Sequence, residues 1–393
     1  MKNKKTVIIL FTFIIMTVCC SCGKNQNESK TNVEYDKLTW NNNTEKYEEN
    51  SVVFFYKKSA DGKYCWITKL DVLDEYKSDK LEFPKEMNGS VLIRIGFDVR
   101  DVKKNAPDVR YSVFGSSLSD NFEYPQRFKS IQHIALPDSV QSIEDGTFVG
   151  LYSLKTINGP KELKRIGVGA FNDCSGITEF EIGEYVSEIG LGAFRNCGRL
   201  GKIHISANNK KYYEQGGFVI DKEQKQAVMA IPGKKELVIP SSVNSFRKNC
   251  FEVCKIKRID LESGENRFIK NGNYIYRKNN KALLLGIVNE KTAIIPESIE
   301  ELNQDSILIG EDIDRVEMPE SLKYLRGAWL DMVDADDCTY VFKSENPPRF
   351  VEPSESTSMV PIGQKIFVPK QSFEKYEKWL KKNNGEMNLL KTF

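Results

Sequence analysis

Cysteine and histidine are the residues of this chain with the clearest potential for chemistry, because a thiolate or an imidazole can act as nucleophile, base or metal ligand. Cys250 and Cys254 are four residues apart, and Cys174 and Cys197 recur 23 residues apart. Such spacings invite a metal-site interpretation. Whether these side chains do chemistry or pack a core depends on the elements that carry them.

Those elements are repeats. IGVGAFNDC begins at Ile166, IGLGAFRNC follows 23 residues later, and SIEDGTF places Phe148 in the same frame. The apolar cores IQHIAL, LKTING, ITEFEI and LGKIHI keep this period. Periods of about 20–29 residues with an L-x-x-L-x-L core are typical of leucine-rich-repeat solenoids. One coil cannot bury its apolar face alone, so neighbouring coils must stack.

The pattern returns after two interruptions, in LVIPSSV, AIIPESI and VEMPESL. Two related segments, near 207–235 and 264–291, align at an offset of 56 residues and alternate apolar with polar residues around Gly or Asn. Each predicts a β-hairpin or short meander inserted into the array. We therefore expect a β-rich repeat solenoid over 131–350.

The ends of the array are expected to be capped, because a solenoid needs its terminal apolar faces covered. Residues 46–130 predict an N-terminal β cap and a divergent first coil, and residues 351–393 predict a strand and a short capping helix. Ser372 is the expected N-cap of this helix, which presents a stripe of Phe373, Tyr376 and Leu380.

The repeat pattern, IP.SV..IG..AF..C..L..I.I, resembles that of the BspA-like leucine-rich-repeat proteins, a family of surface lipoproteins and secreted proteins. The resemblance covers roughly Leu81 to Leu380 and includes both inserts and the ending IFVPKQSFEKYEKWLKKN. It implies a leucine-rich-repeat array with a role in adhesion or recognition at the cell surface. The coils at Ile307 and Leu330 lack the Phe and Cys of the pattern, so we expect them to be irregular.

The repeat frame argues against metal chemistry. Cys174, Cys197 and Cys254 each follow the repeated Phe by three residues, at a position that the pattern buries. Small apolar-like thiols that pack one coil on the next explain them better than a metal site does. Adjacent coils would also bring Cys174 and Cys197 within plausible disulfide distance. The redox state of these three and of Cys250 stays open.

The sequence also argues against catalysis. The two histidines, His133 and His204, fall on solvent-facing positions three coils apart, roughly 15 Å by strand spacing. No P-loop, Rossmann glycine pattern, H-E-x-x-H or G-x-S-x-G motif occurs. Lys plus Arg total 57 against 55 Asp plus Glu, mixed along the chain, which is unlike a nucleic-acid-binding protein. We expect no enzyme activity, no cofactor, no metal and no nucleic-acid partner.

The N-terminus predicts export. Three lysines precede an uncharged apolar run, as in a signal peptide over 1–21. The ending CCSC resembles a bacterial lipoprotein signal with Cys22 as the lipidated residue; Cys20 and an ordinary secretory signal are the alternatives. Residues 22–45 begin with a polar stretch that predicts a flexible tether. We expect a lipid-anchored cell-envelope protein, at the outer membrane or surface of a bacterium, with no membrane contact besides its lipid.

The remaining candidate site is the exposed face of the stacked strands, which suits an extended protein or glycan ligand. Its predicted residues are His133, Thr156, Asn158, Glu179, Glu181, Lys202, His204, Arg258 and Arg315, with Tyr212 and Tyr274 of the inserts as competing contacts. We expect a monomeric binding module. A structural or assembly role for a partner within the same envelope is the alternative.

Overall fold

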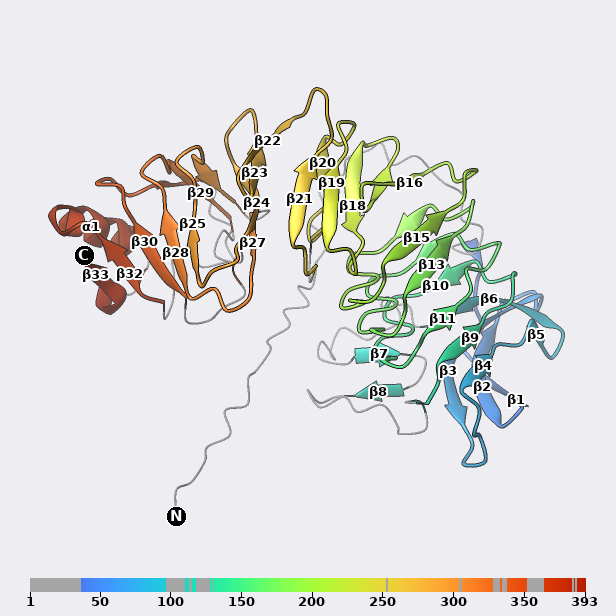
Figure 1. Cartoon of the computed structure of the whole chain (residues 1–393). Helices are drawn as coiled ribbons and strands as arrows, with labels where there is room; N and C mark the ends of the chain where they lie inside the picture. Colours follow the sequence, from blue (N-terminus) through green and yellow to red (C-terminus); the bar gives the residue numbers. More distant parts are fainter. Residues whose placement is uncertain are drawn as a thin grey trace, which may run out of the picture.

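The computed structural model describes residues 37–96, 130–251, 254–303, 306–327, 338–351 and 364–393 except 384 and 386, together with 110–112, 115–117, Phe128 and Val333. These residues form a solenoid that curves as an arc from β1 (Glu45–Glu49) to α1 (Phe373–Lys382), as Figure 1 shows. The predicted β-rich repeat solenoid is thus confirmed. The signal peptide, most of the tether and the coil at Leu330 lie outside the described residues.

Each coil contributes one strand to what we call the first ladder, in which neighbouring coils pair in parallel within separate short sheets. The register places Glu179 beside Lys202 and Glu181 beside His204, 23 residues apart. The first-ladder strands are β4 (Lys80–Glu82), β9 (His133–Ala135), β11 (Thr156–Ile157), β13 (Glu179–Ile182), β15 (Lys202–Ile205), β19 (Glu236–Ile239), β21 (Arg258–Leu261), β25 (Thr292–Ile294), β28 (Arg315–Met318), β30 (Thr339–Phe342), β32 (Ile366–Val368) and β33 (Leu390–Thr392).

A second ladder runs along another side of the coils. Its strands are β6 (Ser90–Ile95), β10 (Ser142–Ile143), β12 (Arg165–Ile166), β14 (Glu188–Ile189), β20 (Ser245–Phe246), β26 (Glu301–Leu302), β29 (Tyr324–Arg326) and β31 (Arg349–Val351). Parallel pairing joins Ile143 to Ile166 and Ile166 to Ile189, as the 23-residue frame predicts. The coil that contains Ile307 departs from the regular coils, as expected: it forms the strand β27 (Ile307–Ile309) where the regular coils form a turn around Phe148, Phe171 and Phe194. Parallel backbone pairing with the last strand of the preceding insert orders this segment without the Phe and Cys.

Between the ladders the chain turns sharply after β10, β12 and β14. Gly146, Gly169 and Gly192 adopt φ of 63°, 59° and 60° there, a region that disfavours residues with a Cβ. The turn brings the repeated Phe back into the core, where Phe148, Phe171 and Phe194 are all buried. The glycine of the repeat allows the bend, and the bend directs the side chain of the following phenylalanine into the core.

Both inserts are three-stranded antiparallel meanders, as predicted. The first consists of β16 (Tyr212–Gln215), β17 (Phe218–Asp221) and β18 (Gln226–Ala230), and the second of β22 (Phe268–Asn271), β23 (Tyr274–Arg277) and β24 (Leu283–Ile287). The last strand of each meander then pairs in parallel with the next coil, β18 with β20 and β24 with β27. An insert therefore replaces part of a coil while keeping the backbone pairing of the array.

The inserts divide the interior into three apolar cores. Val219 packs into the core that reaches back to the N-terminal cap, whereas Phe218 and Ile220 pack into the next one. In the second insert Ile275 and Leu285 face that same middle core, whereas Tyr276 and Leu283 face the C-terminal core. Strands β17 and β24 are buried along their whole length for this reason. Each insert is therefore a small sheet that separates two apolar cores and contributes side chains to both.

The N-terminal cap continues the second ladder. The strands β1, β2 (Val52–Lys58) and β3 (Tyr64–Val72) form an antiparallel unit, and β3 then pairs in parallel with β6. The predicted N-terminal β cap is thus confirmed. The strand β5 (Glu86–Met87) pairs with β6, while β7 (Arg110–Ser112) and β8 (Gly115–Ser117) form a separate hairpin.

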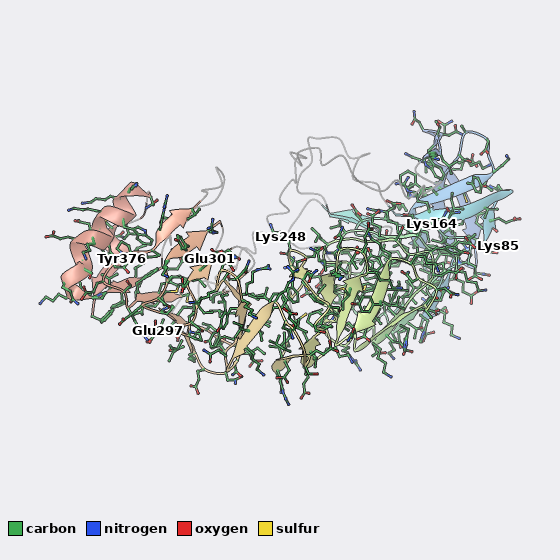
Figure 2. The ribbon with its side chains drawn as sticks, turned by 90° about the horizontal axis from the view of Figure 1, so that it is seen from above. Lys85, Lys164, Lys248, Glu297, Glu301 and Tyr376 are labelled. Carbon is green, nitrogen blue, oxygen red and sulfur yellow. The ribbon has the colours of Figure 1, made fainter. Side chains whose placement is uncertain are left out.

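The C-terminal helix covers the other end. Tyr376 and Leu380 of α1 are buried, and the Trp379 ring stacks on Phe350 with centroids 4.8 Å apart. Figure 2 shows Tyr376 where α1 meets the neighbouring strands. Ser372 takes the N-cap position without a side-chain capping hydrogen bond. The one-turn 3-10 helices Lys370–Ser372 and Met387–Leu389 flank α1, and β33 follows as a further strand that the sequence did not predict.

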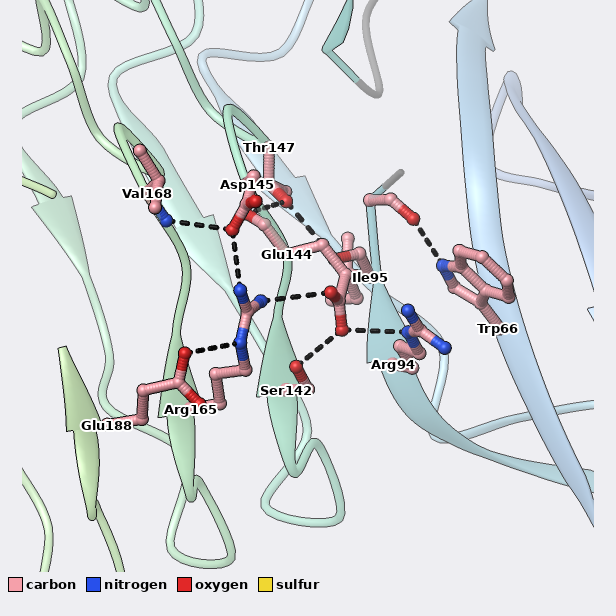
Figure 3. Close-up of polar contacts among 11 residues, drawn as sticks. Trp66, Arg94, Ile95, Ser142, Glu144, Asp145, Thr147, Arg165, Val168 and Glu188 are labelled. Carbon is pink, nitrogen blue, oxygen red and sulfur yellow. Dashed lines mark hydrogen bonds and ion pairs between the residues drawn. The ribbon is translucent and has the colours of Figure 1, made fainter. Parts of the chain in front are cut away.

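A buried ion cluster joins the N-terminal cap to the repeats (Figure 3). The Glu144 carboxylate accepts hydrogen bonds from Arg94 Nε at 2.7 Å, Arg165 Nη1 at 2.9 Å and Ser142 Oγ at 2.6 Å. The Arg94 guanidinium also lies 3.9 Å from the centroid of the Trp66 ring. Burial raises the pKa of Glu144, although the two arginines oppose this shift. The paired charges therefore fix the cap against the first regular coils.

Arg165 is the hub of this cluster. Besides Glu144 it binds Asp145 at 2.6 Å and Glu188 at 2.9 Å, so one guanidinium connects three coils. Burial lowers the pKa of Arg165, but the three carboxylates outweigh burial and raise it above its ordinary value.

Within the described residues, no helix combines the length and hydropathy needed to cross a membrane.

Candidate binding face

The outward positions of the first ladder form the candidate binding face. Along β13 and β15 exposure alternates strictly: Glu179 and Glu181 are exposed, whereas Phe180 and Ile182 are buried. The same alternation exposes Lys202 and His204. Because parallel strands stack in register, the exposed residues of successive coils lie in rows across the ladder.

His133, Thr156 and Asn158 lie on the N-terminal part of this face. His133 Nδ1 is 2.7 Å from Thr156 Oγ1, the neighbouring residue in the register. The Asn158 amide accepts a hydrogen bond from the backbone N–H of Leu136 and donates one to its carbonyl, both at 2.7 Å. The amide of Asn158 thus links two coils, and its polar atoms serve the fold.

Glu179, Glu181, Lys202 and His204 form the most regular part of the face. The register places Glu179 beside Lys202 and Glu181 beside His204. His204 Nε2 lies 3.4 Å from Glu179 Oε2, diagonally across the two strands. These four side chains, brought together by the 23-residue period, offer donors and acceptors in a compact patch. His133 is separated from them by β11 and does not join His204 in one site.

Arg258 and Arg315 lie on separate parts of the ladder, beyond the first and second insert respectively. Arg258 pairs with Asp260 at 2.6 Å, and Arg315 pairs with Glu317 at 3.0 Å. Lys343 also pairs with Glu317, and it is the main cause that lowers the pKa of this carboxyl. The ion pairs orient both arginines along the face.

Exposed aliphatic side chains accompany these charges. Val238 on β19 and Ile294 on β25 are 41% and 56% exposed, at the ladder position next to Asp260 and Glu317 respectively. An apolar side chain flanked by ordered charges is a common feature of surfaces that bind macromolecules.

The two tyrosines predicted as competing contacts have different environments. Tyr212 is only 4% exposed, and its hydroxyl donates to the carbonyl of Ser187, so it belongs to the core and is removed from the candidate face. Burial raises its pKa to about 12. The expectation that Tyr212 is a surface contact is therefore wrong, because the insert lies between two apolar cores and its side chains pack into them. Tyr274 is half-buried, and burial raises its pKa as well.

A pocket of about 420 Å³ opens where the first insert leaves the ladder. His204 of β15, Tyr213 and Glu214 of β16, and Lys222 of the β17–β18 turn contribute to its lining. Glu214 and Lys222 were not predicted from the sequence. The 56-residue offset between the inserts distinguishes Glu214, which corresponds to Lys270, but not Lys222, which corresponds to Lys278.

The cysteines belong to the core. All six cysteines in the described part of the chain are buried. Cys174 Sγ lies 3.1 Å from the carbonyl oxygen of Phe148, and Cys197 Sγ lies 3.1 Å from that of Phe171. Each thiol thus contacts the backbone of the preceding coil, which confirms the predicted packing role. The described residues contain no group of three or more His, Cys, Asp or Glu side chains placed to hold a metal ion.

Several solved structures are similar to this chain at low sequence identity. A leucine-rich cell surface protein from Faecalibacterium prausnitzii is 16% identical, with 89% of this chain and 94% of that chain covered and a TM-score of 0.44. The pneumococcal vaccine antigen PcpA is 14% identical, covering 88% and 97% with a TM-score of 0.42. A leucine-rich-repeat protein from Bacteroides ovatus is 15% identical, covering 88% and 99% with a TM-score of 0.36.

No curated protein sequence matches the chain. The family model of the BspA-type leucine-rich-repeat region does match it, in six copies over residues 121–218 and 231–328. These copies coincide with coils that the structure stacks at a 23-residue spacing. The chain therefore belongs to the BspA-type leucine-rich-repeat family.

Proposed function

We propose that this protein is a non-enzymatic, lipid-anchored module of the bacterial cell surface that binds a protein or glycan through the first ladder. The observation that carries the proposal is the patch on β13 and β15, where exposed Glu179, Glu181, Lys202 and His204 stand in register over a buried core. Extended faces of this kind are the usual binding surfaces of solenoid proteins.

The side chains of the face are ordered before any ligand arrives. His133 contacts Thr156, His204 contacts Glu179, and Arg258 contacts Asp260. Ordering side chains in advance lowers the entropy that binding would otherwise cost. Val238 and Ile294 add exposed apolar area to the same ladder. Together these features support binding rather than catalysis, and the alternating charges favour recognition of a specific partner.

Lys202→Glu tests the proposal, because it places a third carboxylate beside Glu179 and Glu181. The exported chain and this variant would be tested on an array of glycans and extracellular host proteins. Lys248→Glu, an exposed lysine in the turn after β20, is the matched control. We expect Lys202→Glu to weaken binding of the captured partner and Lys248→Glu to leave it unchanged. Equal binding by all three proteins would contradict the proposal.

Protease treatment of intact cells tests the location. Digestion of the solenoid on intact cells would support the cell-surface role. Protection until the cells are opened would instead favour a structural or assembly role with a partner inside the envelope.

A further inference from the structure

The first ladder is interrupted between β15 and β19, where the first insert crosses it. The pocket of about 420 Å³ lies at this interruption. Ile205, Ser206 and His204 line it from the ladder side, and Tyr213, Glu214 and Lys222 line it from the insert. Its volume is in the range of small-molecule sites, which combine an apolar surface with a few placed polar groups.

The second insert provides an internal comparison, since it crosses the ladder in the same way 56 residues later. Asp260 stands there in place of His204, and Lys270 stands in place of Glu214. Asp260 and Lys270 form an ion pair that joins the strand to the insert. The two groups that face each other across the second crossing therefore satisfy each other.

At the first crossing the corresponding groups are held in other directions. His204 contacts Glu179 of the neighbouring strand, at 3.4 Å. Glu214 Oε1 accepts a hydrogen bond from the backbone N–H of Gly217 within its own hairpin, at 3.0 Å. No ion pair between the ladder strand and the insert is formed by His204 and Glu214, in contrast to Asp260 and Lys270. The first crossing therefore has a pocket where the second crossing has an ion pair. The polar groups of this pocket are oriented by their hydrogen bonds to neighbouring residues.

The polar groups of the pocket combine donors with acceptors. Lys222 Nζ donates to the carbonyl of Asn209 at 2.5 Å, and an ammonium carries three N–H donors. Glu214 supplies carboxylate oxygens, while His204 and Ser206 can each donate or accept. One ammonium and one carboxylate leave the pocket without a dominant charge. Such a pocket favours neither an anion nor a cation.

The apolar part of the pocket is equally defined. Ile205 and Tyr213 are half-buried, and the Tyr213 hydroxyl is 3.0 Å from Ser242 Oγ, which fixes the ring position. Tyr212, which also lines the pocket, is buried. A ligand with C–H faces for the aliphatic and aromatic carbons and hydroxyls for the polar rim would satisfy every group present.

We propose that this pocket binds a neutral saccharide, whose hydroxyls pair with Glu214, Lys222 and His204 while its ring lies against Ile205 and Tyr213. This assignment rests on the proposed binding function and names the class of ligand for one part of the face. A phosphorylated or carboxylated ligand could pair with Lys222 but would meet the like charge of Glu214, and a cationic ligand could pair with Glu214 but would meet the like charge of Lys222. Neutral sugars avoid both conflicts.

The test is saturation-transfer NMR with the full exported chain and a panel of neutral mono- and disaccharides built from glucose, galactose, mannose and N-acetylglucosamine. The double substitution His204→Asp with Glu214→Lys reproduces the ion pair of the second insert and should close the pocket. Because the fold already accepts this pair at Asp260 and Lys270, the variant is expected to fold. We expect saturation transfer to at least one sugar, and affinity weaker by about tenfold or more in the closed variant.

Lys248→Glu serves as the control, since it reverses an exposed charge that is not part of the pocket lining. It should retain saccharide binding. No transfer to any sugar at millimolar concentration, or equal transfer to the wild type and the closed variant, would overturn the saccharide assignment. Displacement of the sugars by an unglycosylated peptide that binds more tightly would also overturn it. The proposed function is tested separately, by the loss of partner binding in Lys202→Glu but not in its control variant. If that loss is observed, the proposed function stands whatever the saccharide result.

Discussion

The Phe171 ring stacks on the Phe194 ring of the next coil, with centroids 5.2 Å apart and planes inclined by only 10°. Phe148 stacks on the other side of Phe171, at 5.4 Å and 18°. Three coils therefore present the same ring at the same height, and the spacing of the rings matches the spacing of the paired strands. This spine explains why the repeat retains both the phenylalanine and the glycine that precedes it.

Phe171→Ala should destabilise the array strongly. The ring is fully buried between two others, and removing it leaves a cavity that rigid neighbouring coils cannot fill. The expected loss of unfolding free energy is about 3–5 kcal/mol. Urea unfolding would measure the loss, and hydrogen exchange should show it first between residues 148 and 197. Glu179→Ala, on the exposed face of the same coil, should change stability by less than about 0.5 kcal/mol. Equal effects from the two variants would contradict a spine of stacked rings.

Arg165→Ala should loosen the junction between the cap and the repeats. It removes the group that pairs with Glu144, Asp145 and Glu188, and it leaves the buried carboxylate of Glu144 with one cation fewer. Breaking a buried ion pair costs about 3–5 kcal/mol. Hydrogen exchange of β6 and β10 would report the loosening directly.

The matched control for Arg165 is Lys161→Ala. Lys161 also forms a short ion pair, with Asp138 at 2.6 Å, but its side chain is 80% exposed. Exposed pairs contribute little to stability, because both charges stay in contact with water. A similar loss of stability in both variants would show that the buried cluster contributes no more than a surface pair.

The thiols of Cys174 and Cys197 should be unreactive in the folded protein at neutral pH. Both are fully buried, and burial raises the pKa of Cys197 to about 12, so the reactive thiolate is scarce. Labelling with a maleimide followed by peptide mapping should modify these positions only after urea is added. A Cys174–Cys197 disulfide detected by mass spectrometry in the native exported protein would contradict the assignment as free packing thiols.

Asp260→Asn should have a pH-dependent effect. The hydrogen bond from Lys270 is the main cause that lowers the pKa of Asp260 below its ordinary value of 3.8. The folded protein therefore binds fewer protons at this site than the unfolded chain does, and the contribution of Asp260 is complete above that ordinary value. It is lost as the pH falls through the folded-state pKa.

The measurement is the stability difference between the wild type and Asp260→Asn from neutral pH to below pH 3.8. The wild type should be favoured by less than about 1 kcal/mol at neutral pH, with the difference shrinking on acidification. Glu265→Gln, an exposed residue between β21 and β22, is the control. A difference that grows on acidification would show that the pKa is shifted in the opposite direction.

Cys22→Ser tests the lipid anchor. If Cys22 carries the lipid, the variant should be released from the membrane fraction or remain unprocessed, because no second anchor is predicted. Fractionation of cells followed by intact-mass analysis would show this. Normal membrane retention in Cys22→Ser, with loss of retention in Cys20→Ser, would move the lipidation site to Cys20.

The sequence alone determined the repeat architecture. A 23-residue period fixes which residues of successive coils become neighbours, and the apolar position of Phe171 within that period identifies it as core. The same period predicted that Glu179, Glu181, Lys202 and His204 are exposed, because the alternation of side chains along a strand follows directly from residue order. Local periodicity carries this information since each coil contacts only its neighbours.

Only the tertiary structure decided the features that depend on contacts outside the period. Tyr212 looked like a surface aromatic, yet the first insert packs as a wall between two cores and buries it. Arg165 has no distinctive pattern in the sequence, and its role arises because three carboxylates from the two neighbouring coils converge on it. The pocket at His204 likewise requires the insert to cross the ladder at that point, which is a matter of packing in three dimensions.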